Sequence, residues 1–510
     1  MRWRSLLVLT AAVLVIGTAS GTPSLAAPGP RVLRVGTFNG ISGQFSTIQA
    51  AVNAARPGDW ILVGPGDYHE RGTKTDGVLI TTPGIHLRGM ERNSVIVDGT
   101  SASAPRPCAS DAKYQILGGR NGIKVFKASD THVENLTVCN FLTGPNGGGN
   151  EIWWNGGDGS GAIGMHSYSG VYLTASTTYT NGFDHPRGEY GIFASNADGP
   201  GSISYSYASN MGDAAYYVGA CPNCNAKLDH VQAENSALGY SGTNSGGNLI
   251  ITNSEFDNNK TGLVSNSQNN DDQPSPQNGS CPAGSGPAVS GAVGCTIFTN
   301  NHIHNNNNAN VPGAGMGLAG AAPVGTGVVL AGTEFVTLYA NTIENNGAWG
   351  ALVADLPDQE SAPPGFPQCT GGTWDPNSQL CYYQAFGNYV WQNSFQHNGF
   401  FGNPSNGDIG LATATHDPGN CFHDNSDPNG LSSDPPNIQS YPYYPCGTPN
   451  GGDMGVLAAE ALCATQLLAP CPSLPGANYP RPVQVQLSPI PVEPSMTDPC
   501  SGVPHSPWCP

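Results

Sequence analysis

Proton-exchanging and charged side chains crowd one short stretch of the sequence. It contains Asp184, His185, Arg187, Glu189 and Tyr190, which supply two acids, an imidazole, a guanidinium and a phenol. Elimination or epimerisation of a uronic acid needs a base that removes a proton beside the sugar carboxylate, and a cation that neutralises this carboxylate. A catalytic loop would use His185 or Tyr190 for the proton and Arg187 for the carboxylate. A plain corner loop would instead form an exposed Asp184–Arg187 ion pair of little energetic weight.

Cations are scarce in most of the chain, which limits the candidates for a carboxylate ligand. After residue 128 the lysines and arginines are Arg187, Lys227, Lys260 and Arg481. We therefore add Lys260 to the candidate catalytic residues. A long polyanion groove lined with basic side chains is excluded over this part of the sequence.

A further acid, Asp213, follows Glu189 by about one repeat length and is followed by two tyrosines. In stacked strands the equivalent residues lie about 4.8 Å apart. Two carboxylates at that distance raise each other's pKa or bind Ca²⁺ together. Asp213 is therefore a candidate catalytic acid, and Ca²⁺ is the candidate cofactor.

The overall composition narrows the class of partner. The 510 residues include 36 acidic and 18 basic side chains, so the formal net charge is -18, and only 11% of residues are charged. An ordinary soluble domain is about 25% charged. Nucleic acid is disfavoured as a partner because phosphate contacts need clustered cations. A polar, acidic surface suits polysaccharide or cell-wall glycan, calcium or plain solvation.

The N-terminus has the pattern of a secretory signal peptide over residues 1–27. Two arginines precede the apolar run 6–16, and small residues follow at 24–27. We expect a secreted, extracellular protein with no membrane span in the mature chain. Fourteen cysteines in an exported protein favour disulfides. The local pairs we predict are Cys108/Cys139, Cys221/Cys224, Cys281/Cys295, Cys369/Cys381, Cys421/Cys446, Cys463/Cys471 and Cys500/Cys509.

A loose internal repeat must position the candidate residues. Segments with a short apolar strand, a turn, an alternating strand and an Asn- or Gly-rich corner start at Tyr190, Ala214, Gly239 and Thr261, at steps of about 22 to 25 residues. One such unit cannot bury both faces of its strands, whereas stacked units share a continuous core. The repeat predicts an all-β parallel solenoid, with a short amphipathic helix over 45–55 before it.

Asparagine clusters and interruptions refine this prediction. Asn tolerates left-handed backbone angles, so 258–259, 304–308 and 345–346 are predicted corner ladders. His302 and His304 share a strand face, as a copper or zinc pair would, but the sequence offers no third ligand nearby. The repeat is broken by three interruptions at 144–161, 268–293 and 357–384. The last two contain or adjoin predicted disulfides and are predicted to be stapled, projecting loops. After residue 434 the chain becomes rich in Pro, Ser and Cys, which predicts an extended, disulfide-pinned tail over 434–510.

The helix Ser46–Ala51 and the following 57–63 and 64–68 segments closely resemble the N-terminal cap of right-handed parallel β-helix proteins of the pectin-lyase-like superfamily. Segments 212–219 and 352–357 are similar to the repeats of that group. The resemblance implies a single-stranded right-handed β-helix over 31–430 with a capping helix. The loop 182–190 is distantly similar to the Asp-Pro-His-Asp loop of mannuronan epimerases, although its order here is Asp184-His185-Pro186.

Two classes of function follow from these patterns. The first is a polysaccharide lyase or epimerase of uronate-containing glycans, with a glycoside hydrolase as a weaker enzymatic alternative because the hydrolase family's basic tripeptide is missing. The second is a non-catalytic glycan-binding or cell-surface structural β-helix. We expect a monomer in both cases. Gathering of the candidate side chains at one place would favour the enzyme, and their dispersal would favour the binder.

Overall fold

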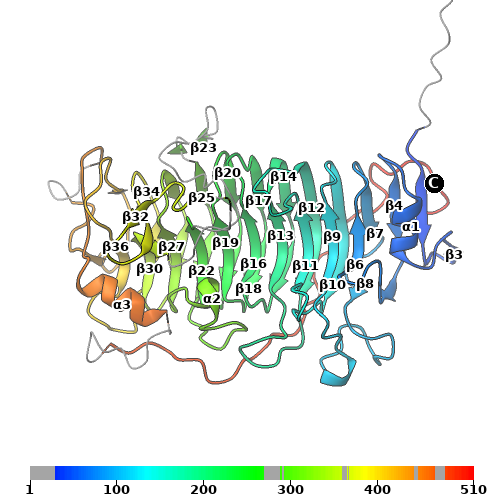
Figure 1. The fold of residues 1–510 in the computed structure, drawn as a ribbon, viewed down its shortest axis with the longest axis horizontal. Helices are drawn as coiled ribbons and strands as arrows, with labels where there is room; N and C mark the ends of the chain where they lie inside the picture. Colours follow the sequence, from blue (N-terminus) through cyan, green and yellow to red (C-terminus); the bar gives the residue numbers. More distant parts are fainter. Residues whose placement is uncertain are drawn as a thin grey trace, which may run out of the picture.

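The computed structural model describes residues 29–268, 288–289, 292–293, 295–358, 365, 367–440, 446–465 and 477–510. Within them the chain winds into a right-handed parallel β-helix whose coils stack along one long axis (Figure 1). The fold class that the sequence predicted is therefore confirmed. The predicted signal peptide, Cys281, Cys471 and much of the 268–293 insertion lie outside the described residues.

One face of the solenoid is an 11-stranded parallel sheet. Its strands are β6 (Asp76–Ile80), β9 (Asn121–Phe126), β11 (Asn150–Asn155), β13 (Tyr190–Ser195), β16 (Ala214–Gly219), β19 (Leu238–Thr243), β22 (Thr261–Asn266), β27 (Thr326–Ala331), β30 (Trp349–Ala354), β36 (Gly407–Ala412) and β38 (Ser433–Asp434). We call its solvent side the outer face of the 11-stranded sheet.

The other strands of the coils join a 20-stranded sheet that is bent into two parallel rows. The first row is β1 (Val32–Val35), β4 (Trp60–Val63), β7 (His86–Gly89), β10 (Thr131–Cys139), β12 (Met165–Ser176), β14 (Ala197–Ser204), β17 (Ala226–Asp229), β20 (Leu249–Thr252), β25 (Thr296–Thr299), β28 (Val336–Tyr339), β34 (Tyr389–Trp391) and β37 (Cys421–His423). The second row is β5 (Gly66–Tyr68), β8 (Val95–Asp98), β15 (Tyr207–Ser209), β18 (Gln232–Glu234), β21 (Glu255–Asp257), β26 (His302–His304), β29 (Thr342–Glu344) and β35 (Ser394–Gln396). The long strands β10 and β12 pair in both rows.

Several short helices and strands lie outside the two large sheets. The helices are α1 (Ile48–Ala54), α2 (Gly317–Gly320), α3 (Val456–Ala464) and the 3-10 turn η1 (Ala112–Tyr114). Antiparallel pairs outside the coils are β2 (Thr37–Phe38) with β3 (Ile41–Ser42), β23 (Ala288–Val289) with β24 (Ala292–Val293), and β33 (Leu380–Tyr383) with β31 (Leu356–Asp358) and β32 (Thr373–Asp375).

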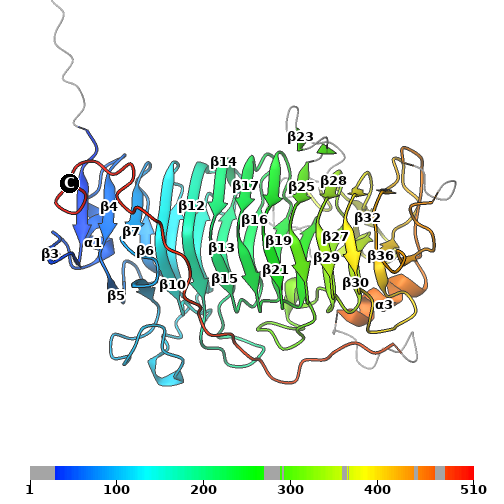
Figure 2. The same cartoon turned by 180° about the vertical axis from the view of Figure 1, so that it is seen from behind.

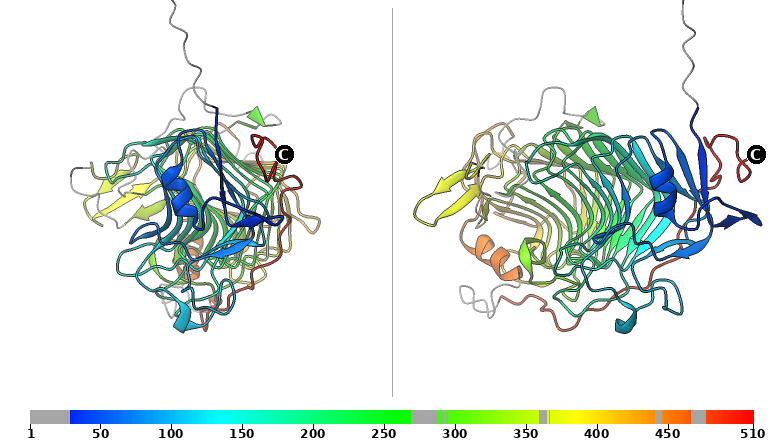
Figure 3. Two further views of the ribbon diagram at one scale, coloured as in Figure 1. Left: turned by 90° about the vertical axis from the view of Figure 1, so that its right-hand side faces the viewer. Right: turned by 45° about the vertical axis from the view of Figure 1, so that its right-hand side comes forward.

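The helix predicted over 45–55 is present as α1 beside the first coils (Figure 3). Thr47 caps it by accepting a hydrogen bond from the amide of Ala50, and Ile48, Ala51 and Val52 face the core. α1 contacts β1, β4 and β6. Its function as the cap of the solenoid stays a prediction.

The core is a set of in-register apolar stacks. In the first row, Leu228, Ile251, Phe298, Leu338 and Val390 occupy one position of successive strands, and each is fully buried. Because every coil adds a residue to the same stack, the core continues along the axis without a break.

Asparagine ladders follow the buried corners, as the sequence predicted. Each ladder amide donates to the carboxamide oxygen of the next coil, which satisfies polar groups that are shut off from water. One ladder is Asn259, Asn306, Asn346 and Asn398. Further ladders, which the sequence did not reveal, include Asn301, Asn341, Asn393 and Asn425, and Asn388 with Asn420.

Five of the predicted disulfides are present among the described residues. They are Cys108–Cys139, Cys221–Cys224, Cys369–Cys381, Cys421–Cys446 and Cys500–Cys509. In the same part of the chain, no helix is both long enough and apolar enough to cross a bilayer.

The C-terminal segment 477–510, which we call the strap, runs back along the solenoid and ends beside the first coils (Figure 2). Ser488 bonds to Asn210 and Glu493 to Asn93, so the strap contacts coils far apart in sequence. At its end the Trp508 indole donates to the carbonyl of Ile41. The sequence predicted an extended tail, and the structure adds its path along the whole molecule.

Candidate functional site

The loop before β13 holds a charged pair whose two members differ in exposure. Nη2 of Arg187 donates to Glu189 Oε1 at 3.1 Å, and Nε lies 3.0 Å from Oε2. The Arg187 side chain is 5% exposed and that of Glu189 21%. Arg187 also donates to the carbonyl of Phe183 and lies directly over Gly212, where a Cβ would stand 2.1 Å from its Nε. The guanidinium is therefore locked between two coils.

Asp213 completes this cluster one coil further on. The amide of Asp213 donates to the carbonyl of Glu189, and the Tyr190 hydroxyl donates to Asp213 Oδ2 at 2.7 Å. Burial, and next the charge of Glu189, raise the pKa of Asp213 to about 7, against the opposing effects of Tyr190 and Arg187. Burial, together with the Asp213 charge, also raises the pKa of Tyr190 well above its usual value. A carboxyl that changes protonation near neutral pH is suited to acid–base chemistry.

Asp184 and His185 do not join the cluster. Both are exposed at the tip of the loop, where Asp184 accepts a hydrogen bond from the amide of His185. The His185 imidazole lies 2.7 Å from Thr143 Oγ1, which in turn accepts from the Arg187 amide. The predicted exposed Asp184–Arg187 ion pair is not formed, because Arg187 is buried and turned toward Glu189.

Lys260 also lies apart from the cluster. Its side chain is fully buried, and its ammonium donates to the carbonyls of Gly320 and Thr465. Burial lowers the pKa of Lys260 to about 7. Carbonyl oxygens, and not a carboxylate, receive this ammonium, so Lys260 fixes two chain segments in place.

One of these segments covers the cluster. In the stretch 309–324 around α2, Gly313 donates to the carbonyl of Phe183 and lies against Gly212. Ala319 and Ala322 pack against Ala214 and its in-register neighbours. Because Lys260 holds Gly320, it positions the cover over Asp213 without contacting Asp213 itself.

An aromatic strip extends from the cluster over the outer face of the 11-stranded sheet. Trp153 of β11, Phe193 of β13 and Tyr217 of β16 occupy one register position. The Trp153 and Phe193 rings are parallel with centroids 5.1 Å apart, and Tyr190 stacks on Phe193 at 4.5 Å. Such faces bind sugar rings well, because they offer apolar area beside polar groups.

Lys124 of β9 ends the strip and was missed by the sequence reasoning, which counted cations only after residue 128. Its ammonium lies 4.3 Å from the centre of the Trp153 ring. Among the described residues it forms no ion pair with a carboxylate. Three strand spacings separate Lys124 from the β16 register, or about 14 Å. The in-register repeat β9, β11, β13 was the signal that could have revealed it.

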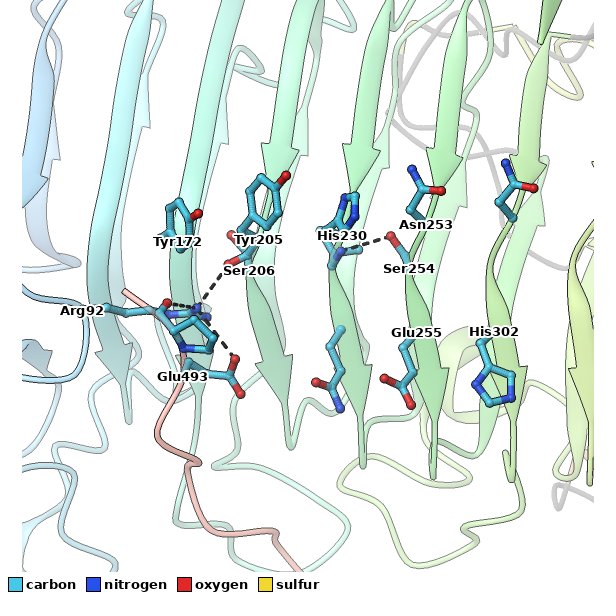
Figure 4. A pocket seen from close by; sticks show the side chains of 14 residues that line it. Arg92, Tyr172, Tyr205, Ser206, His230, Asn253, Ser254, Glu255, His302 and Glu493 are labelled. Carbon is cyan, nitrogen blue, oxygen red and sulfur yellow. Dashed lines mark hydrogen bonds and ion pairs between the residues drawn. The ribbon is translucent and has the colours of Figure 1, made fainter. Parts of the chain in front are cut away.

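A separate groove lies on the 20-stranded sheet, where its two rows meet. It has a volume of about 440 Å³ and is bounded on one side by Glu493 and Pro494 of the strap (Figure 4). Tyr172, Tyr205 and His230 stack along it with ring centres 5.1 and 5.0 Å apart. This ladder is exposed, with Tyr205 46% accessible.

The acids predicted to bind Ca²⁺ are already engaged. Glu189 pairs with the guanidinium of Arg187, and Asp213 accepts from Tyr190. A cation between the two acids would stand beside Arg187 and be repelled by it. This pair therefore fits a proton-transfer site better than a calcium site.

No family model matches the sequence, and no curated protein sequence matches it. Similar solved structures include the A-module of a mannuronan C-5 epimerase from Azotobacter vinelandii, at 14% identity over 75% of this chain and 91% of that chain, with a TM-score of 0.42. A mannuronic acid specific family 6 polysaccharide lyase from human gut microbiota has 12% identity, coverages of 78% and 80%, and a TM-score of 0.38. Pectin methylesterase PemA from Erwinia chrysanthemi has 16% identity, coverages of 55% and 80%, and a TM-score of 0.32. The fold assignment rests on the strand pairing, and these likenesses do not extend it to an activity.

Proposed function

We propose that the protein is an exported polysaccharide-processing enzyme that moves a proton through Asp213 and Tyr190, as a lyase or epimerase of uronate-containing glycan. The observation that carries the proposal is the 2.7 Å hydrogen bond between these side chains at one end of an aromatic strip. Five disulfides among the described residues fit an oxidising compartment outside the cytoplasm.

The chemistry requires one proton to leave carbon 5 of the sugar. The Asp213 carboxylate accepts this proton, and the Tyr190 hydroxyl is the neighbouring donor. In an elimination the departing glycosidic oxygen receives a proton from Tyr190, and Asp213 then reprotonates Tyr190 through their hydrogen bond. In an epimerisation Tyr190 gives its proton to the opposite face of carbon 5, and Asp213 then reprotonates Tyr190 through the same hydrogen bond. A carboxyl with a pKa of about 7 is able both to accept and to release a proton at neutral pH.

Substrate binding would use the strip. The rings of Trp153 and Phe193 offer a flat apolar surface to successive sugars, and Lys124 would bind a carboxylate at the far end. A substrate carboxylate beside Asp213 would compete with Glu189 for Arg187. Two cations along one line favour a polyanionic chain over a neutral one.

The test uses Asp213→Asn, which keeps a group that accepts the Tyr190 hydrogen bond but cannot take a proton. The purified protein is incubated with polyuronates and neutral polysaccharides, with calcium or a chelator, while unsaturated ends, reducing ends and incorporation of solvent deuterium at carbon 5 are followed. We expect turnover of a polyuronate and a loss of about 10²–10⁴-fold in Asp213→Asn. Asp111→Asn, at an exposed turn, is the matched control.

Absence of every product and of deuterium exchange would overturn the enzymatic proposal, as would full activity of Asp213→Asn. Arg187→Ala is a weaker test, because it leaves the partly buried Glu189 without its partner and disturbs folding.

A second candidate function is glycan binding without catalysis. The exposed ladder of Tyr172, Tyr205 and His230 favours it, because an open row of stacked rings offers a continuous flat surface to a sugar chain. Binding that is lost in Tyr205→Ala, with no turnover of any glycan, would select this candidate.

A further inference from the structure

Two histidines project side by side from β26, below the aromatic ladder of the groove. His302 and His304 alternate with the buried Ile303, so both imidazoles lie on the outer side of the strand, with His302 43% and His304 13% exposed. Their ring centres are 3.9 Å apart and their planes differ by 28°. The sequence suggested such a pair but offered no third ligand.

The neighbouring coils supply the missing acids. Glu255 of β21 lies opposite His302 in the register, and its Oε1 is 3.1 Å from Nε2 of His304. Glu344 of β29 lies on the other side, with Oε1 2.9 Å from Nε2 of His302. Glu255 and His302 both face the groove in Figure 4. The two histidines thus stand between two carboxylates that are far from them in sequence.

We propose that His302, His304 and Glu255 bind a divalent zinc ion, with Glu344 as the fourth ligand. A ligand atom from each of the first three lies within 4.8 Å of the other two. Zinc bonds of about 2.0–2.2 Å require ligand atoms about 3.4 Å apart, so side-chain rotations of about 1 Å close the site. Imidazole nitrogen is a ligand that zinc accepts and that calcium and magnesium avoid.

Asn305 is placed to fix the orientation of the His304 ring. The Asn305 carboxamide lies 2.9 Å from Nδ1 of His304. When the carboxamide is turned over, its oxygen accepts a hydrogen bond from Nδ1–H of His304, which leaves Nε2 with a free lone pair for the metal. The entrance is open, since the side chains of His302 and Glu255 are 43% and 45% exposed.

The local charge also favours a cation. Asp257 lies opposite His304 in the register, and Glu234 lies opposite Asp257 on the preceding coil. Among the described residues, no lysine or arginine forms an ion pair with Glu234, Glu255, Asp257 or Glu344. A bound dication would offset this accumulated negative charge.

Other groupings of ligand atoms in the described chain are less suitable. Two of them contain disulfide sulfurs, which are not thiolates. The third combines Asp67, His69 and Asp98, but Asp98 accepts backbone amides at Thr100 and Cys108. Of the groupings found among the described residues, only the His302 group joins two imidazoles to a carboxylate.

The experiment titrates Zn²⁺ into the chelator-treated full chain by calorimetry and measures bound metal after dialysis. We expect one zinc ion per chain and binding at least about 100-fold weaker in His302→Gln and in His304→Gln. His166→Gln is the matched control, because His166 is exposed beside Asp198 but has no second histidine. It should bind zinc as the wild type does.

Spectroscopy makes the test independent of stability. X-ray absorption of the zinc complex should show two imidazole ligands, and Glu344→Gln should weaken binding by about 10-fold. Unchanged thermal unfolding of metal-free His302→Gln would show that its loss of zinc is not a loss of fold. The proposal is overturned if the wild type retains no zinc, or if His302→Gln retains it as tightly.

Discussion

The Asp213 cluster and the groove are both built from side chains of neighbouring coils, but the cluster is more deeply buried than the groove. In both, side chains at one position of successive coils meet at the strand spacing. The cluster lies beneath the segment around α2, and burial raises the pKa of Asp213 to about 7. The groove is open, and the side chains of His302 and Glu255 are 43% and 45% exposed. A covered corner therefore holds a carboxyl whose pKa suits proton transfer, whereas an open corner holds side chains that a ligand can reach.

The strap lines the groove with Glu493 and Pro494, whereas near the Asp213 cluster it bonds to Asn310 of the covering segment. Loosening the end of the strap should therefore disturb the groove more than the cluster. Trp508→Ala removes a ring that is 4% exposed and packs with Trp60, Leu62 and Met90. We expect packing of the strap against the coils to become less favourable by about 3–5 kcal/mol. Hydrogen exchange should accelerate over 486–496 while the amides of β13 and β16 stay protected.

The control for this variant is Trp374→Ala, which removes a ring that is 40% exposed. If Trp508→Ala binds zinc or glycan more weakly in the groove but keeps its turnover at Asp213, the groove depends on the strap and the cluster does not. An equal loss of binding and of turnover would contradict this difference between the two regions.

Lys260 and Asp213 should give opposite pH dependences. Burial lowers the pKa of Lys260 to about 7, so between pH 7 and 10.5 the unfolded chain binds more protons and the native state gains stability as pH rises. Between pH 7 and pH 10.5, the free energy of unfolding of the wild type should rise by on the order of 2–4 kcal/mol relative to that of Lys260→Met. Urea denaturation at both limits measures it, and Lys227→Met, half exposed beside Asp229, should show little change.

For Asp213 the sign is reversed. Its pKa is raised from 3.8 to about 7, so the native state binds more protons between these values and loses stability as pH rises through them. Between pH 4 and pH 8, the free energy of unfolding of Asp213→Asn should therefore rise by on the order of 1–3 kcal/mol relative to that of the wild type. The exposed Asp184→Asn should show no such gain in the same denaturation series. A flat difference for Asp213→Asn would mean that this carboxyl is solvated like those of the groove.

The smallest effect is expected on the open side. Tyr205→Ala removes one ring of the stacked ladder, which should weaken glycan binding by about 0.5–1.5 kcal/mol, or about 2–10-fold. Affinity electrophoresis or calorimetry with oligosaccharides measures it. Tyr389→Ala removes a tyrosine of similar exposure on β34 and should leave affinity unchanged.

Several features of the structure could be predicted from the sequence alone. Ile48, Ala51 and Val52 repeat at helical spacing, so α1 was readable from the sequence. Five cysteine pairs lie close in sequence, so their disulfides were readable as well. Arg187, Glu189 and Tyr190 share one loop, and their link to Asp213 followed from the repeat length. The pairing of Glu255 and Glu344 with the histidines was not readable, because the insertion before β25 and the loop carrying α2 change the spacing between coils.

The sequence by itself determined the repeating coil, its buried stacks and its polar corners, because these depend on periodicity and on residues that tolerate left-handed backbone angles. Only the tertiary structure decided which charges are buried. Arg187 and Lys260 are both cations of the coil corners, yet one meets a carboxylate and the other two carbonyls. The difference arises from Gly320 in the segment around α2 and from Thr465 at the end of α3, which meet Lys260 although they are distant in sequence. Burial and pKa depend on such distant neighbours, and no local pattern contains them.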